Sequence, residues 1–248
     1  MPNSLPSSPA EALPLDTAQM IEVDRLMMEA YHIELIQMME NAGRCLAIVA
    51  RAVFLDGDPQ GKRIAVLAGP GGNGGGAMVC ARRLQSWGAQ VEVFLASEET
   101  KMRPIPGHQL RILQRMGLPI QSGDALPSED PYDLLVDGII GYSVKGAPYG
   151  TPGTMIRWIN DRPEPTLSLD TPSGLDLSTG IMHDPTVQAD ATLTLAMPKQ
   201  GLLHPRARAA VGDLYLGDIS VPPQVYAEPS LGLQAENVFR YADVVRLG

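Results

Sequence analysis

The chain has 248 residues, 44% of them hydrophobic and 19% charged, so it can bury a substantial core and is too apolar to be disordered. Its formal net charge of -9 without a basic run argues against nucleic acid and anionic membranes as partners. No apolar stretch approaches the roughly 20 residues of a membrane-spanning helix, and the N-terminus shows no signal-peptide pattern. Cys45 and Cys80 lie in apolar helical patterns, so we expect buried thiols in a reduced, cytoplasmic protein.

Residues 1–14 are rich in Pro, Ser and Ala and predict a mobile tail, followed by a single domain over residues 15–248. Thr17 can cap a helix that runs to about Tyr31. The apolar side of this helix is expected to consist of Met20, Ile21, Val23, Met27 and Met28.

A second, Met-rich helix is expected from about Leu35 to Phe54. Within it, Glu40 to Gly43 interrupts an otherwise apolar surface. A polar layer beneath a ligand loop would explain this interruption. We favour the simpler interpretation, a solvated face with a glycine that lets another helix approach closely.

A glycine-rich stretch follows the apolar run from Ile64 to Leu67, which predicts a buried strand. Residues 69–76 contain six glycines in eight positions, which predicts a loop, and a helical pattern begins at Ala77. This order leaves backbone N–H groups at a helix N-terminus, where an anionic or phosphate-bearing ligand can bind. The loop satisfies G-x-G-x-x-G, which by itself is a weak signal. Because the amide of Asn73 is free to face a ligand, we favour a binding site over a purely structural turn.

Strand and helix patterns alternate through the rest of the chain. Further strands are expected at Gln90–Ala96, Asp133–Asp137, Pro165–Asp170 and Ala191–Leu195, and helices at about His108–Met116 and Thr154–Asn160. Prolines break the link near Pro104 and Pro106, and the segment after Gly212 mixes a short strand with loop. The alternation predicts an α/β protein with a mostly parallel sheet and helices on both faces.

Polar residues follow three of these strands. Asn73, Asp137 and the Asp170–Ser173 segment would converge at one edge, because the carboxyl ends of parallel strands form the ligand crevice. A single strand-end aspartate usually only caps a turn. A set of several oxygen donors suits a hard cation, and no Cys/His spacing typical of zinc occurs.

Five segments, in this order, resemble motifs of the YjeF N-terminal family, the NAD(P)H-hydrate epimerases. Met39–Gly43 is similar to MENAG, Ala68–Gly76 to AGxGNNGGD, Val136-Asp137 with Gly141 to VDAxxGxG, Asp170–Gly174 to DxPSG, and Ala189-Asp190 with Pro198–Leu202 to AD followed by PKxGL. The resemblance covers the chain from about Leu15 to Leu202.

This resemblance implies a three-layer α/β/α Rossmann-like sandwich that interconverts the R and S hydrates of NADH and NADPH, with a bound potassium ion (K+). It assigns the metal to Asn73, Asp137 and Ser173. It assigns the substrate to Gly72, Asn73, Gly74, Gly75, Gly76, Gly141, Tyr142, Ser143, Val144, Lys145, Gly146, Ala147 and Asp170. We choose Asp170 as the catalytic general acid/base. A homodimer is a further expectation, because some domains of this type dimerise.

The chain departs from the family motifs at two glycines. Gly72 stands where the family has an Asn and Gly76 where it has an Asp, and the segment 141–147 lacks the usual Gly-Thr-Gly and Arg-Pro-like residues. A non-catalytic ligand-binding or dimerising scaffold is therefore the alternative to an epimerase. An NAD-dependent oxidoreductase would rest on G-x-G-x-x-G alone, and Ser173 lacks the glycine spacing of a hydrolase nucleophile.

Overall fold

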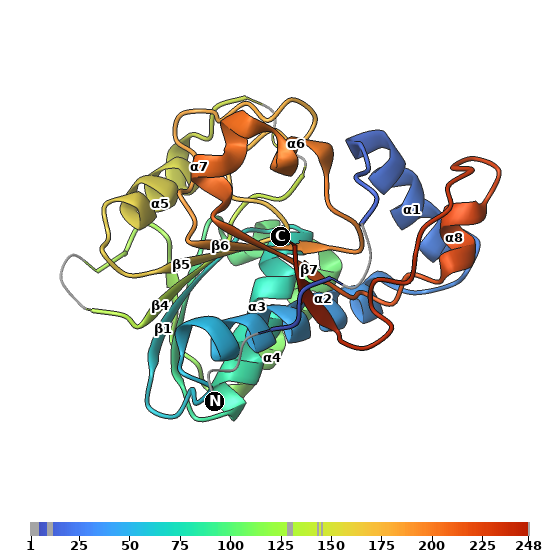
Figure 1. Ribbon diagram of the computed structural model, residues 1–248. Helices are drawn as coiled ribbons and strands as arrows, with labels where there is room; N and C mark the ends of the chain where they lie inside the picture. Colours follow the sequence, from blue (N-terminus) through green and yellow to red (C-terminus); the bar gives the residue numbers. More distant parts are fainter. Residues whose placement is uncertain (1–4, 9–11, 128–130, 143, 145, 248) are drawn as a thin grey trace.

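Eight strands form one sheet in the computed structural model, which describes residues 5–8, 12–127, 131–142, 144 and 146–247 (Figure 1). In spatial order they are β3 (Ile120–Ser122), β2 (Gln90–Leu95), β1 (Arg63–Ala68), β4 (Leu134–Gly138), β5 (Thr166–Leu169), β6 (Ala191–Leu195), β7 (Asp213–Gly217) and β8 (Val244–Arg246). All neighbours from β3 to β7 are parallel, and β8 is antiparallel to β7. The predicted α/β fold with a mostly parallel sheet is confirmed.

The central strands are apolar throughout because helices cover both faces of the sheet. Ile64 and Val66 pack in the core on one face, whereas Ala65 and Leu67 pack in the core on the other. On the first face lie α2 (Leu35–Val49) with its π-helical continuation η1 (Ala50–Phe54), α3 (Gly72–Ser86) and α4 (Pro104–Met116). On the second lie α5 (Gly150–Asn160), α6 (Gln200–Leu203), η3 (Pro205–Ala207) and α7 (Arg208–Val211). The three-layer architecture follows from this arrangement.

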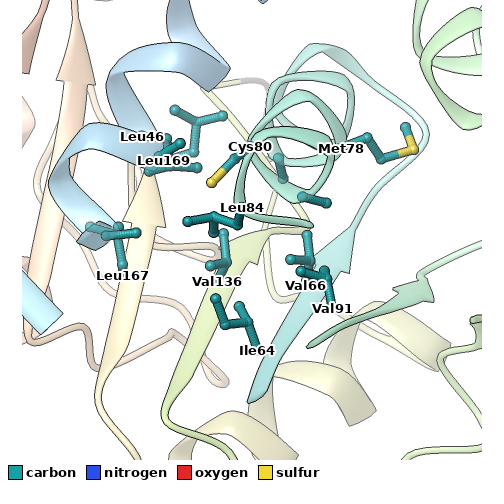
Figure 2. Packing of buried hydrophobic residues seen from close by; sticks show 14 of the residues in the cluster. Leu46, Ile64, Val66, Met78, Cys80, Leu84, Val91, Val136, Leu167 and Leu169 are labelled. Atoms are coloured by element: carbon teal, nitrogen blue, oxygen red, sulfur yellow. The ribbon is translucent and has the colours of Figure 1, made fainter. Parts of the chain in front are cut away.

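The contact between α2 and α3 holds the glycine-rich segment against the sheet. Figure 2 shows Cys80 and Leu84 of α3 packed over buried side chains of β1, β4 and β5. A β-carbon on Gly43 would overlap Val79 of α3, so the expected close helix approach at this glycine is confirmed. Glu40 differs from the expected solvated residue, because it is half-buried between Arg82 and Gln109.

Helices α1 (Thr17–Glu29) and α8 (Pro223–Ala227) pack together at one side of the sheet (Figure 1). Leu15, just before α1, forms an isolated parallel β-bridge with Lys199, which lies beyond the carboxyl end of β6. The N-terminal cap of α1 is Asp16 rather than Thr17, because Asp16 accepts a hydrogen bond from the Gln19 amide at 2.8 Å. The buried side of α1 consists of Met20, Val23, Leu26 and Met27, whereas Ile21 and Met28, expected on the apolar side, are exposed.

Several boundaries differ from the expected ones for local reasons. Helix α4 begins at Pro104 because proline is well tolerated in the first turn. Strand β3 was not predicted, because it is only three residues long and mostly exposed. The remaining short element is η2 (Glu99–Lys101). Within the predicted N-terminal tail, Pro6 and Ser8 exchange backbone hydrogen bonds with Arg246 of β8. Among the described residues, no helix is long and apolar enough to span a bilayer.

Candidate active site

A cavity of about 110 Å³ lies at the carboxyl ends of the central strands, between the sheet edge and helices α1 and α2. Its apolar wall comprises Met20, Leu35, Met38, Met39, Ala42, Leu169, Leu195 and Ile219, and its remaining lining comprises Asp24, Gly72, Asn73, Tyr142, Asp170 and Lys199. An engineered apolar cavity of about 150 Å³ holds benzene, so this smaller one takes at most a single ring. Apolar walls with a few convergent polar groups are typical of ligand sites.

A buried ion pair between Asp170 and Lys199 lines this cavity. Lys199 Nζ lies 2.5 Å from Asp170 Oδ1, and also donates to Thr194 Oγ1 at 3.1 Å and the Leu195 carbonyl at 2.9 Å. The two side chains are 3% and 5% exposed, so the ammonium charge balances a carboxylate that is almost fully removed from water. Asp170 also has φ +63°, in the left-handed region where non-glycine residues are uncommon and which is often found at functional sites.

Asp24 is a second carboxyl group at the same cavity. It follows Met20 by one helical turn on α1, and both residues line the cavity. Burial raises the pKa of Asp24 to about 6; the Lys199 charge opposes this shift and the Asp170 charge adds to it. The site therefore holds two carboxyl groups in different environments.

The N-terminus of α3 begins at Gly72, so the predicted loop over residues 72–76 is the first turn of a helix. A β-carbon on Gly74 would overlap the backbone of Gly69, which explains why glycine is required although its helix propensity is poor. Gly71 has no side chain with which to cap the helix, which leaves the first-turn N–H groups for a ligand. Gly72 and Asn73 line the cavity, whereas Gly75 and Gly76 are buried.

Asp137 and Ser173 form a buried network beside the cavity. Ser173 donates to Asp137 through its hydroxyl at 2.6 Å and its amide at 2.8 Å, and Ser168 adds a hydroxyl at 2.8 Å. Asp137 is fully buried and has no ion-pair partner among the described residues. Burial raises its pKa, and these hydrogen bonds oppose the shift.

The third predicted metal residue, Asn73, reaches the same region from α3. Its amide nitrogen donates to the Leu169 carbonyl at 2.7 Å. Its Oδ1 lies against Gly141: a β-carbon added to Gly141 would come within 2.7 Å of this oxygen. The neighbouring Ile140 amide donates to Ser173 Oγ at 2.8 Å, so Asn73 and Ser173 contact adjacent residues of one segment.

The predicted substrate segment 141–147 contributes less to the cavity than expected. Tyr142 lines it, whereas Val144, Gly146 and Ala147 are not among its lining residues. Ser143 and Lys145 lie outside the described residues. Asp24 and Lys199 also line the cavity but were absent from the predicted site. The sequence contained a signal for each: Asp24 is an acid one helical turn after Met20 in an apolar helix, and Lys199 is the lysine of the PKxGL-like motif.

The fold and the site together define a Rossmann-like α/β protein that has a ligand cavity where the carboxyl ends of its parallel strands meet. Residues 35–201 match the sequence profile of the family described as YjeF-related protein N-terminus, and the chain belongs to this family. The predicted resemblance is confirmed.

Three relatives place the chain within this family. It is 39% identical over 218 residues to the NAD(P)H-hydrate epimerase of Dehalogenimonas lykanthroporepellens, covering 88% of this chain and 86% of that protein. It is 32% identical over 210 residues to the NAD(P)H-hydrate epimerase of Entamoeba histolytica, covering 84% and 88%. It is 37% identical to the bifunctional NAD(P)H-hydrate repair enzyme Nnr of Moorella thermoacetica, covering 85% of this chain and 41% of that longer protein.

A solved structure agrees with the fold. The crystal structure of yeast ynu0 superposes with a TM-score of 0.77 at 25% sequence identity. The match covers 95% of this chain and all of the yeast chain, so it includes both the sheet and the helices around the cavity.

Proposed function

We propose that this protein is an NAD(P)H-hydrate epimerase, which interconverts the R and S forms of hydrated NADH and NADPH. The observation that carries the proposal is the Asp170–Lys199 ion pair at this small cavity, beside the N-terminus of α3, which no described side chain caps. The names of the two single-function relatives, which align over most of their length, support it.

The reaction inverts one carbon of the reduced nicotinamide ring, which carries a hydroxyl next to the ring nitrogen. Loss and re-addition of this hydroxyl, or opening and closing of the ring, both invert the centre, and both require proton transfer. Asp170 is our general acid/base. Lys199 donates to Asp170 Oδ1, so the other carboxylate oxygen of Asp170 is free to accept the proton that the reaction releases.

The diphosphate of the substrate fits the N-terminus of α3. None of the described side chains caps the first-turn N–H groups there, and the positive end of the helix dipole favours an anion. The chain has a net charge of -9, which as a whole repels an anion. The positive end of α3 is therefore the feature that would attract and orient the diphosphate. The nicotinamide ring then extends from this end of α3 into the cavity beside Asn73 and Asp170.

A potassium ion fits beside the same helix end. A fully buried carboxylate without a cationic side chain is costly, and Asp137 is in this situation among the described residues. Asp137, Ser173 and Asn73 supply the oxygen donors that hard cations prefer. A bound K+ would balance the charge of Asp137 and help to hold a polar group of the substrate.

The test is the epimerisation of purified R-hydrate, with the S-hydrate removed and detected by a separate S-specific dehydratase. A rate well above the uncatalysed one supports the proposal. No acceleration over a buffer control would favour the alternative, a non-catalytic scaffold that has lost the side chains at Gly72 and Gly76. The cavity with its two carboxyl groups and buried lysine supports the enzyme over the scaffold.

A further inference from the structure

We propose that Asp24 is a second catalytic residue of this site: it donates a proton to the departing hydroxyl while Asp170 accepts one. The proposal deepens the proposed epimerase function and rests on it. Three observations about Asp24 support the proposal.

The first observation is position. Asp24 enters the cavity from α1, whereas Asp170 and Lys199 enter it from the segments that follow β5 and β6. A ring bound between α1 and the sheet edge would therefore present one face to each carboxyl group. Inversion of a ring carbon needs groups on both faces, because the hydroxyl must depart from one and return to the other.

The second observation is that Asp24 has no hydrogen-bond or ion-pair partner within the described part of the chain. The other acids of α1 behave differently: Glu22 and Glu29 both pair with Arg25 at 2.8 Å, on the outer side of the helix. A structural carboxylate is normally held by donors, as Asp137 is. An unpartnered carboxyl group at an apolar cavity weakens the fold, and such groups persist where function needs them.

The third observation is the electrostatic surroundings. Among the described residues, the titratable groups that face Asp24 from the packed elements are Lys199, Asp170, Tyr142 and Tyr226. Lys199 is already paired with Asp170, so Asp24 remains in a desolvated position that favours its protonated form. Two carboxyl groups whose environments differ in this way supply an acid and a base at one site.

The proton transfers balance over one epimerisation. As the C–O bond breaks, its electron pair leaves with the oxygen, which takes the Asp24 proton and departs as water. The ring nitrogen supplies the electrons for a temporary C=N bond. Water then adds to the opposite face, the C=N pair returns to nitrogen, and Asp170 takes the released proton. One proton has moved from Asp24 to Asp170, and exchange with solvent restores both groups.

The test compares Asp24→Asn with Glu29→Gln, a matched loss of one carboxylate on the exposed side of the same helix. We expect Asp24→Asn to lower kcat by roughly 10²–10⁴-fold with little change in KM, and Glu29→Gln to leave both unchanged. In the unmutated protein kcat/KM should fall above about pH 6, where Asp24 loses its proton. The residual rate of Asp24→Asn should lack this fall.

Two results would overturn the assignment while leaving the epimerase intact: an Asp24→Asn protein as active as Glu29→Gln, or one whose pH profile keeps the unmutated fall. An unmutated protein that does not accelerate epimerisation refutes the proposed function and this inference together, which separates the two failures. Thermal unfolding of each variant guards against misfolding, and Asp24→Glu, which restores an acid, should recover part of the lost rate.

Discussion

Lys199 holds Asp170 by one carboxylate oxygen only. Oδ1 accepts from Lys199 Nζ, Thr194 Oγ1 and the Leu195 amide, whereas no hydrogen bond to Oδ2 occurs among the described residues. Asp170 directly follows β5 and Lys199 follows β6, so two neighbouring parallel strands bring the pair together. One oxygen of Asp170 is thus fixed by the fold and the other remains for substrate.

The first prediction concerns Asp170→Asn. The amide keeps the shape and cannot take up a proton, so kcat should fall by roughly 10²–10⁴-fold while hydrate binding, measured by calorimetric titration, stays largely intact. The change also leaves Lys199 without its counter-charge, which costs about 3–5 kcal/mol of unfolding free energy in buried pairs.

A double variant separates the two effects. Adding Lys199→Met to Asp170→Asn removes the uncompensated ammonium, so urea unfolding should show that much of the lost stability returns. Epimerisation should stay abolished. If the double variant regains activity along with stability, the loss in Asp170→Asn was a folding defect and Asp170 is not the base.

Much of this site could be predicted from the sequence because parallel strands bring their carboxyl ends to one edge. Asp137 and Ser173 were expected together, and they bond at 2.6 Å. Asp24 could not be placed, because α1 reaches the cavity only through packing with Ile219, Val225 and other distant residues. A helical pattern shows that an acid interrupts an apolar face, but not which element lies opposite.

The start of α3 shows a second limit of local patterns. Glycines disfavour helices, so the segment 72–76 was expected to be a loop, and the structure shows helix from Gly72. The reason lies in tertiary contacts: a β-carbon on Gly75 would overlap Met39 of α2. Close packing against the sheet and α2 overrides the intrinsic preference, and no local sequence window contains those partners.

The second prediction concerns the two glycines that depart from the family motif. A β-carbon on Gly72 would meet nothing within 4 Å, so Gly72→Asn should leave the melting temperature nearly unchanged. If its amide regains one hydrogen bond to the substrate, worth about 0.5–1.5 kcal/mol, kcat/KM should rise roughly two- to tenfold.

Gly76→Asp is the matched comparison. Its β-carbon would come within 2.6 Å of Leu169 Cδ2, a buried side chain in the cavity wall. We expect a loss of about 1–3 kcal/mol in unfolding free energy from overpacking, which offsets any gain in binding. Equal stability of the two variants would show that Leu169 moves aside freely.

The third prediction concerns potassium. If K+ binds the folded protein at Asp137, KCl should raise the melting temperature more than NaCl or choline chloride at equal ionic strength. At 100 times the dissociation constant the gain is about 2.7 kcal/mol. Asp137→Asn should abolish the difference between the salts, whatever its own stability, because the charge that K+ balances is gone. Asp213→Asn, at an exposed ion pair far from the cavity, is the control that should keep the difference.

The last prediction concerns the effect of Asp24 on stability. Its pKa is raised from 3.8 to about 6 in the folded protein, so the native state binds the proton more tightly than the unfolded chain. Below about pH 4 both states carry it, and Asp24→Asn, which resembles the protonated form, should match the unmutated protein. As pH rises from about 4 to 6 the unmutated protein should lose stability relative to Asp24→Asn. Above about pH 6 the variant should be about 1–3 kcal/mol more stable, since each pKa unit corresponds to about 1.4 kcal/mol.

Urea unfolding of both proteins at pH 4 and pH 8 measures this, and Glu29→Gln should show no such gain. A variant that is more stable but inactive would identify Asp24 as a residue kept for chemistry; an Asp24→Asn protein that is less stable at pH 8 would show that the carboxylate has a partner that stabilises the fold.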